Sequence, residues 1–144
     1  LVRLARWRGW RTVSDPLVLV LHVGYLWVPL GLLLLAASVL ETAIPRTAAI
    51  HALTTGAMAT MILAVMTRAI LGHTGRELRA NAATVAIYVL ITLAAIVRVA
   101  APLGLVSYRM GMEAAGGLWI GAFVLFLVAY GPILFRSRLG DPSQ

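Results

Sequence analysis

The chain has 144 residues, of which 61% are hydrophobic and 12% are charged, and its mean hydropathy is +0.94. In a typical soluble domain about a quarter of the residues are charged, so this composition excludes a soluble enzyme, a soluble nucleic-acid-binding protein and a disordered tail. The net charge of +7 comes from 12 arginines, with no lysine, against five acidic residues. The chain contains no cysteine, which excludes disulfides, thiolate metal sites and iron–sulfur clusters. Any metal must therefore be held by histidine, methionine or carboxylate ligands.

Four long apolar segments predict an all-α transmembrane helical bundle. They cover residues 16–40, 47–71, 80–101 and 113–135. Each has the roughly 20 residues that a helix needs to cross ~30 Å of hydrocarbon. The connections between them are short, and short connections force neighbouring helices to run antiparallel. We interpret residues 1–144 as a single transmembrane domain and, since the first residue is Leu rather than Met, expect it to be a fragment of a larger bundle.

The arginines indicate which end of the bundle faces the cytoplasm. Most of them precede the first span, lie between the second and third spans or follow the fourth, namely Arg3, Arg6, Arg8, Arg11, Arg76, Arg79, Arg136 and Arg138. With four spans these segments share one face, whereas the opposite face holds mainly Arg46 and Arg109. Because cationic loops are enriched on the cytoplasmic side, we expect both termini to lie in the cytoplasm.

Ionisable residues within apolar spans are the first candidates for function, since each costs a few kcal/mol unless it is paired or used. On the expected cytoplasmic side lie His22, Arg68 and His73, and on the outer side lie His51 and Arg98. His51 and His73 are separated by about 33 Å along one helix and cannot share a site. His22 and His73 can share one, because antiparallel spans bring those two ends to the same level.

The second span has one face on which polar and sulfur-containing side chains gather. At 100° per residue, a single broad stripe contains His51, Thr55, Met58, Ile62, Val65 and His73. A helix facing only lipid would not collect histidine, threonine and methionine on one side. We therefore expect this face to look inward, toward partner helices or a cofactor.

Two levels of the bundle are candidate cofactor sites. Imidazole is a common axial ligand of haem iron and also binds copper. On the inner side, His22 and His73 would be the ligands of a haem, and Arg68 or Arg76 would face its propionates.

On the outer side, His51 would be the ligand and Arg98 would face the propionates, with a second ligand from elsewhere. Thioethers favour Cu(I), which adds a set of methionines as secondary copper candidates, namely Met58, Met61, Met110 and Met112.

Three stretches of the sequence resemble the NnrS family. They are LHVGYLWVPLGL around His22, HALTTGAMATM from His51, and VMTRAILGHTGR, which contains Arg68 and His73 and ends at Arg76. The third and fourth spans agree with the family only in general hydropathy. The long strings are far more specific than a single histidine.

The resemblance implies a polytopic protein of the bacterial inner membrane that binds haem and copper and is linked to denitrification and the nitric oxide response. It carries over His22, His51 and His73 as metal or haem ligands and Arg68 as the charged residue of the same motif. It also implies a longer parent whose additional N-terminal helices would be partners of this chain. The family's role is protective or regulatory, so no reaction is assigned and a conventional enzyme is not expected.

Each of these residues also has a purely structural interpretation. A histidine near the end of a span is often only hydrogen-bonded at the interface, and an arginine there most often extends to the headgroups. Methionines on helix faces are more often packing residues than ligands. The GHTG segment from Gly72 to Gly75 is typical of a helix C-cap, where glycine is favoured.

Two other functional classes remain open from the sequence. In the first, the chain is half of a transporter or channel, with a polar path lined by His51, Arg98 and the threonines of the second span. In the second, it is a structural module that packs through small residues such as Gly117 and Gly121. Substituting the histidines would then change nothing beyond stability.

Overall fold

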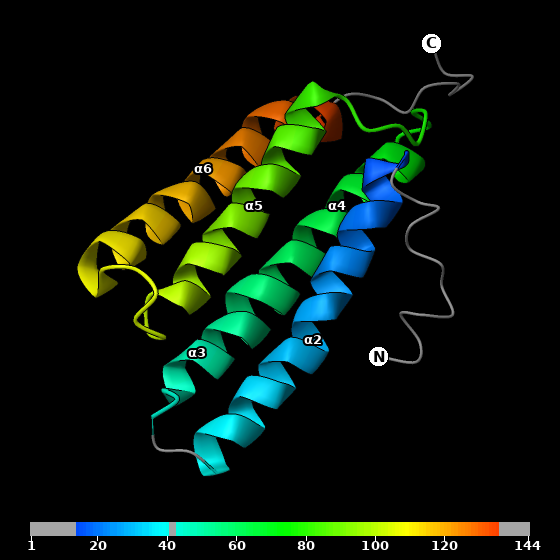
Figure 1. Cartoon of the computed structure of the whole chain (residues 1–144). Helices are drawn as coiled ribbons and strands as arrows, with labels where there is room; N and C mark the ends of the chain where they lie inside the picture. Colours follow the sequence, from blue (N-terminus) through cyan, green and yellow to red (C-terminus); the bar gives the residue numbers. More distant parts are fainter. Residues whose placement is uncertain (1–13, 41–42, 136–144) are drawn as a thin grey trace.

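The computed structural model describes residues 14–40 and 43–135, and its regular elements there are helices. In chain order these are α2 (Pro16–Leu40), α3 (Arg46–His51), the π-helix η2 (Ala52–Ala59), α4 (Thr60–His73), α5 (Ala82–Ala100) and α6 (Tyr108–Leu134). The elements α3, η2 and α4 follow one another without a break and form one span, Arg46–His73. Within the described residues, four helices are therefore long and apolar enough to cross a membrane, and consecutive ones run in opposite directions (Figure 1). This confirms the predicted all-α fold.

The ends of the helices differ from the predicted spans for identifiable reasons. The last helix begins at Tyr108 instead of 113, because its first turn is an exposed polar extension in which Arg109 pairs with Glu113 at 3.0 Å. The third span begins at residue 82 instead of 80, because Asn81 caps α5 by accepting a hydrogen bond from the Thr84 amide. The flanking arginines at 3, 6, 8, 11, 136 and 138 lie outside the described residues.

The Asp15 end is where α2 and α5 begin and α4 and α6 finish, and the Arg98 end is the opposite one (Figure 1). At the Asp15 end, the side chain of Asp15 caps α2 by accepting a hydrogen bond from the Leu17 amide, with Pro16 at the first helical position.

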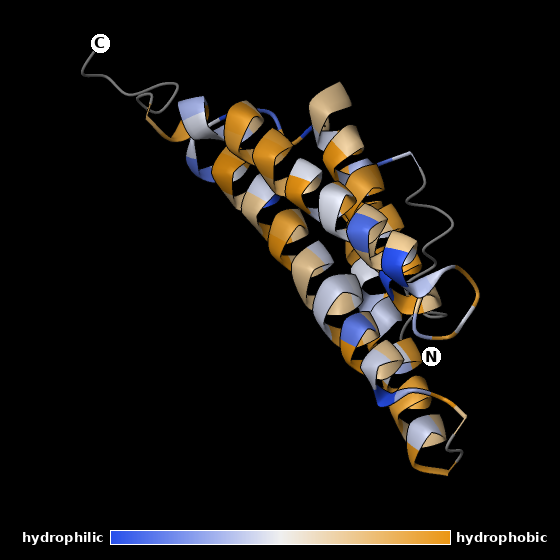
Figure 2. Ribbon diagram, turned by 90° about the vertical axis from the view of Figure 1, so that its left-hand side faces the viewer, coloured by the Kyte–Doolittle hydropathy of each residue, from blue (hydrophilic) through white to orange (hydrophobic). Residues whose placement is uncertain are grey.

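The spans form a row in which the second span and α5 are central and α2 and α6 lie at the edges (Figure 1). The second span is the most enclosed. Of the residues in its apolar stretch, 44% are buried inside the protein, against 22% for α2 and 17% for α6. Hydrophobic residues cover most of the helix length, as Figure 2 shows in orange. An apolar surface of this extent is expected where helices face lipid or further helices.

Glycines allow α2 and the second span to approach closely. A Cβ built on Gly24 would lie 2.8 Å from Met61 Sδ, and one built on Gly56 would lie 2.5 Å from the indole of Trp27. Side chains of each helix therefore occupy the space left by glycines of the other. Gly56 of the second span thus makes room for the Trp27 side chain of α2.

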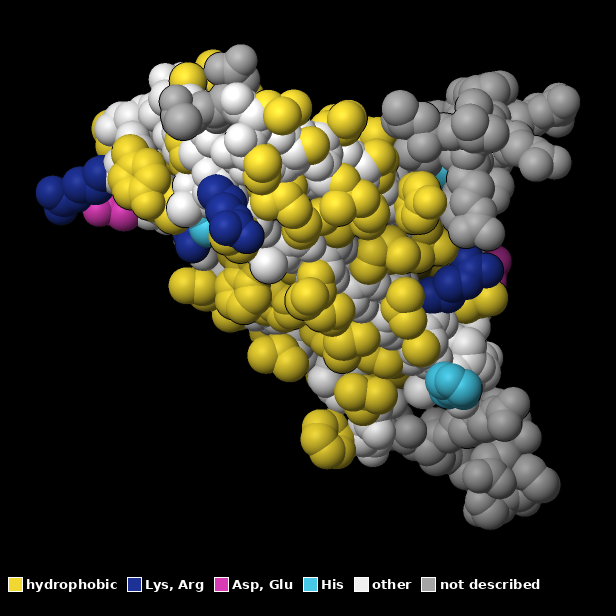
Figure 3. All heavy atoms as spheres, turned by 90° about the horizontal axis from the view of Figure 1, so that it is seen from below, with side chains coloured by type: hydrophobic (Ala, Val, Ile, Leu, Met, Phe, Trp, Pro, Cys, Tyr) yellow, Lys and Arg dark blue, Asp and Glu magenta, His cyan; other side chains and the backbone are white. Residues whose placement is uncertain are grey.

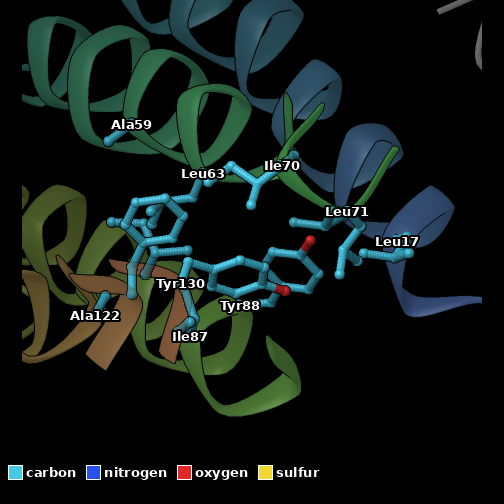
Figure 4. Close-up of a cluster of buried hydrophobic side chains, with 13 residues drawn as sticks. Leu17, Ala59, Leu63, Ile70, Leu71, Ile87, Tyr88, Ala122 and Tyr130 are labelled. Atoms are coloured by element: carbon cyan, nitrogen blue, oxygen red, sulfur yellow. The ribbon is translucent and has the colours of Figure 1, made fainter. Parts of the chain in front are cut away.

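The largest core lies toward the Asp15 end, where all four spans contribute side chains (Figure 4). Two buried hydrogen bonds between hydroxyl groups link α5 to its neighbours. Tyr88 of α5 bonds to Thr67 of α4 at 2.5 Å, and Thr84 of α5 bonds to Tyr130 of α6 at 2.6 Å. The Thr84 hydroxyl donates to Asn81, so Tyr130 must be the donor to Thr84. These bonds satisfy polar groups that would otherwise be costly at membrane depth.

Toward the Arg98 end the core is smaller and a groove opens between two spans. The buried cluster here consists of Ala48, Ala52 and Val99, with Trp27, Leu34 and Leu103 packed against it. The last helix α6 packs along α5 and touches α4, but has no substantial contact with η2. The surface seen from this end is dominated by hydrophobic side chains, with arginines (dark blue) in a few places (Figure 3).

Candidate functional site

The groove between η2 and α6 has a volume of about 510 Å³. Its walls come from three helices, and its lining residues are Thr54, Thr55, Met58, Ala59, Ile62, Arg98, Ala115, Gly116, Trp119, Ile120 and Phe123. The volume falls within the range of small-molecule sites, roughly 300–1,000 Å³. The mixture of apolar walls with a few polar groups is also typical of such sites.

One wall of the groove is built by a π-helix, a rare form of backbone. Eight residues, Ala52–Ala59, adopt it in the middle of an otherwise α-helical span. Gly56 in this segment receives Trp27 on the α2 side, while Thr54, Thr55 and Met58 line the groove. π-helical segments inside α-helices are frequently found at functional sites.

Three residues of the stripe predicted to face inward, Thr55, Met58 and Ile62, line this groove. For the part of the stripe in the second half of the span the prediction is wrong, because Val65 and His73 are exposed.

Arg98, from the last turns of α5, contributes the positive charge of the groove. The only ion pair in the described part of the chain joins Arg109 to Glu113, so Arg98 has no carboxylate partner there. Its charge is close enough to act on the imidazole of His51, which is half-buried one helical turn before the groove-lining threonines. His51 itself does not line the groove, so the outer site of His51 and Arg98 remains a prediction.

The second wall, on α6, was not predicted from the sequence. Trp119 and Phe123 lie with their ring centroids 4.4 Å apart, and both line the groove. A Cβ built on Gly116 meets no atom within 4 Å, so this glycine keeps the groove open. Gly117 has the same open surroundings and Gly121 has only a 4.0 Å contact with Leu90, so within the described structure these two do not provide the predicted close approach.

His22 forms a hydrogen bond with a backbone carbonyl of its own helix, as metal-binding histidines often do. Its side chain, however, faces away from the second span. Its Nδ1 lies 3.0 Å from the carbonyl oxygen of Val18, which can only accept, so Nδ1 carries the proton. In metal sites this type of bond orients the ring and leaves Nε2 to the metal. The face of α2 that contacts the second span contains Gly24. Because successive residues of a helix are about 100° apart, His22 is about 200° from Gly24 around the helix axis and lies on the opposite face. A shared site for His22 and His73 remains a prediction.

The segment containing His73 and Arg76 forms the cap that ends α4. The Arg76 amide donates to the Leu71 carbonyl at 2.9 Å and the Gly75 amide to the Gly72 carbonyl at 3.3 Å, with Gly75 at φ +70°. This pair of bonds is a Schellman motif. The prediction that the segment from Gly72 to Gly75 is a helix C-cap is therefore confirmed. His73 is exposed on the last turn of α4.

Two arginines near this cap were predicted to face haem propionates on the inner side. Arg68 is exposed, whereas Arg76 is half-buried and its Nη1 is enclosed without a hydrogen-bond partner in the described structure. Of the two, Arg76 therefore has the stronger need for an anionic partner.

The candidate methionines divide into packing and exposed residues. Met61 fills the space over Gly24 and is a packing residue. Met58 lines the groove with 61% of its surface exposed, and Met110 is exposed outside it. Met58 is therefore the only one of the four predicted methionines whose side chain lines the groove.

The described residues fit a haem better than a metal held by several protein ligands. Across 14–40 and 43–135, no three or more histidine, aspartate or glutamate side chains form a group that could hold a metal ion. A haem needs only one or two axial side chains, an apolar slot and cations for its propionates. The groove has apolar and aromatic walls, and Arg98 and Met58 are among its lining residues. His51 precedes the lining threonines by one helical turn.

The fold and the groove define a polytopic helical membrane protein with a ligand-sized site toward one end. Comparison with known proteins then gives the family: residues 1–138 match the family model described as NnrS protein. The chain belongs to the NnrS family, which confirms the resemblance found in its sequence. No curated protein and no solved structure matches it.

Proposed function

We propose that this chain is an NnrS-type membrane protein that binds haem, and also copper, in the response to nitric oxide and in denitrification. The proposed location is the bacterial inner membrane, with both termini in the cytoplasm. The proposed haem site is at the Arg98 end, beside His51. His22, His73 and Arg68 remain the alternative site at the Asp15 end.

The observation that carries this proposal is that Arg98 lines a groove of about 510 Å³ and acts electrostatically on the imidazole of His51. An imidazole provides an axial ligand, and a guanidinium without a carboxylate partner provides a cation for propionates. Family membership supports the same conclusion independently.

A bound haem would supply an iron coordination position that can take a small gas such as nitric oxide. The residues of the chain would do the rest. Arg98 would hold an anionic edge, and the walls formed by Ile62, Ile120 and Phe123 would exclude water and ions. An uncharged gas dissolves in lipid and could reach an apolar groove on the membrane-facing side of the protein.

The test is the absorption spectrum of the full chain purified from haem-replete cells, with each histidine replaced by alanine in turn. We expect a Soret band in the unsubstituted protein that is lost or shifted in His51→Ala. The exposed His73 provides the matched control, and His73→Ala should keep the band unchanged.

Two results would change this conclusion. A Soret band that survives in His51→Ala but disappears in His22→Ala or His73→Ala would move the site to the Asp15 end. A colourless, metal-free preparation of the unsubstituted protein would refute haem and copper binding.

A transporter or channel function is the second candidate, because Thr54, Thr55 and Arg98 line one groove. Against it, the described carboxylates lie outside the groove, and proton or cation paths usually contain one at membrane depth. Solute uptake by proteoliposomes that contain the metal-free chain would favour this function over haem binding.

A further inference from the structure

We propose that the loop between α4 and α5, residues 74–81, binds the phosphate group of an anionic phospholipid, and that Arg76 is the residue that holds it. The loop lies at the Asp15 end (Figure 1) and contributes nothing to the groove between η2 and α6. The inference goes beyond the proposed function and does not depend on it, since no haem takes part in the contact.

The first step concerns a charge without a partner. Arg76 is half-buried, and its Nη1 atom is enclosed without a hydrogen-bond partner in the described structure. The only ion pair in this part of the chain joins Arg109 to Glu113, at the opposite end. Because a buried charged donor without an acceptor is costly, an anionic ligand would stabilise Arg76.

The second step concerns the carboxylates near the loop. Asp15 and Glu77 are the described acidic residues at this end, and neither forms an ion pair within the described residues. The Asp15 carboxylate accepts a hydrogen bond from the Leu17 amide at 3.0 Å and so caps α2. Glu77 is exposed. Neither carboxylate therefore neutralises Arg76.

The third step concerns order in the loop. The Arg76 amide donates to the Leu71 carbonyl at 2.9 Å, and the Arg79 amide donates to the Glu77 carbonyl at 2.8 Å. A backbone that is already held in place loses less conformational freedom when a ligand binds. The guanidinium itself presents a rigid fork of donors that matches the oxygen atoms of a phosphate group.

The fourth step concerns depth in the membrane. Arg76 follows the 28-residue span Arg46–His73 by three residues, and the next span begins at Ala82. A helix of that length extends about 42 Å, as much as the hydrocarbon core and both headgroup regions together. The loop therefore lies at headgroup level, where basic pockets between transmembrane helices bind anionic headgroups. This placement favours a lipid phosphate over a soluble one.

The experiment measures lipid binding to the full chain, purified from haem-deficient cells, by native mass spectrometry in detergent. The probes are phosphatidylglycerol, which is anionic, and phosphatidylcholine, which has no net charge, with the same acyl chains. We expect the unsubstituted protein to prefer phosphatidylglycerol. Arg76→Gln should weaken phosphatidylglycerol binding at least about tenfold, or about 1.4 kcal/mol, and leave phosphatidylcholine binding unchanged.

Two other arginines provide matched controls. Arg79 is exposed in the same loop, so Arg79→Gln removes the same charge and should weaken binding less than Arg76→Gln does. Arg109 is exposed at the opposite end and paired with Glu113, so Arg109→Gln should leave binding unchanged. Equal effects of the substitutions at 76 and 79 would show attraction to the whole loop and would overturn the assignment to Arg76.

Equal affinity of the unsubstituted protein for the two lipids would overturn the proposal without the need for any variant. Displacement of phosphatidylglycerol by millimolar inorganic phosphate would show a site for soluble phosphate and would overturn the lipid. Loss of a Soret band in Arg76→Gln with unchanged lipid binding would assign Arg76 to a haem propionate instead. A colourless preparation that binds phosphatidylglycerol through Arg76 would uphold this inference and refute the proposed function.

Discussion

Close contacts at single glycines set the distance between α2 and the second span. The Cβ position of Gly56 lies 2.5 Å from the Trp27 ring, and that of Gly24 lies 2.8 Å from the Sδ atom of Met61. The two contacts differ in how easily they can relax. An indole is rigid, whereas a methionine side chain is flexible and can move aside.

We expect Gly56→Ala to lower the free energy of unfolding by about 1–3 kcal/mol, the usual cost of overpacking. Gly24→Ala should cost less, because only the end of the Met61 side chain has to move. The measurement is unfolding of the purified chain in mixed detergent micelles. Gly116→Ala is the control, since its new methyl group meets no atom within 4 Å. Equal stability of the Gly56 and Gly116 variants would contradict this account.

The second span combines an interruption of its α-helix with a specific helix end. It contains the π-helix Ala52–Ala59 and ends in the Schellman motif of Gly75. The motif explains the glycine at position 75, two residues after His73. Gly75 has a left-handed backbone conformation, which other residues adopt only at a cost, whereas Gly72 lies inside the helix.

Alanine should therefore have opposite effects at these two glycines. Gly75→Ala should reduce the free energy of unfolding by about 1 kcal/mol because of its positive φ. Gly72→Ala should raise it by up to about 1 kcal/mol, since alanine is the better helix former and its Cβ has only one contact, at 4.0 Å. Chemical unfolding followed by circular dichroism measures both values. A loss of stability in Gly72→Ala larger than in Gly75→Ala would rule out the motif.

At the scale of the whole molecule, the four spans form an open row and not a closed bundle. The two edge helices, α2 and α6, are largely exposed. The core shared by all four spans lies at the Asp15 end, and the groove lies toward the Arg98 end. A tightly packed end and an open end within one row allow a ligand site without loss of the common core.

The orientation of this row in the membrane can be tested with single cysteines, because the chain has no cysteine of its own. Glu77 and Leu105 are exposed in loops at the Asp15 and Arg98 ends, respectively. In intact cells, a membrane-impermeant maleimide should label Leu105→Cys and not Glu77→Cys. After lysis it should label both. The reverse pattern in intact cells would place the termini outside the cytoplasm.

The sequence by itself determined the number of spans, their approximate ends and the residues at each end of the bundle. Hydrophobic transfer free energy is a local property of about 20 residues, so spans can be recognised without knowing their neighbours. The same holds for the glycine cap of α4 and for the grouping of His51 with Arg98, which follows from antiparallel connection alone.

Only the tertiary structure decided which faces of the helices meet. In lipid, the buried and the exposed faces of a span are both apolar, so hydropathy does not distinguish them. For this reason the groove wall of Gly116, Trp119 and Phe123, the contact of Trp27 with Gly56 and the π-helix could not be derived from the pattern. They depend on how α6 follows α5 and diverges from η2, which is set by contacts between residues far apart in the chain.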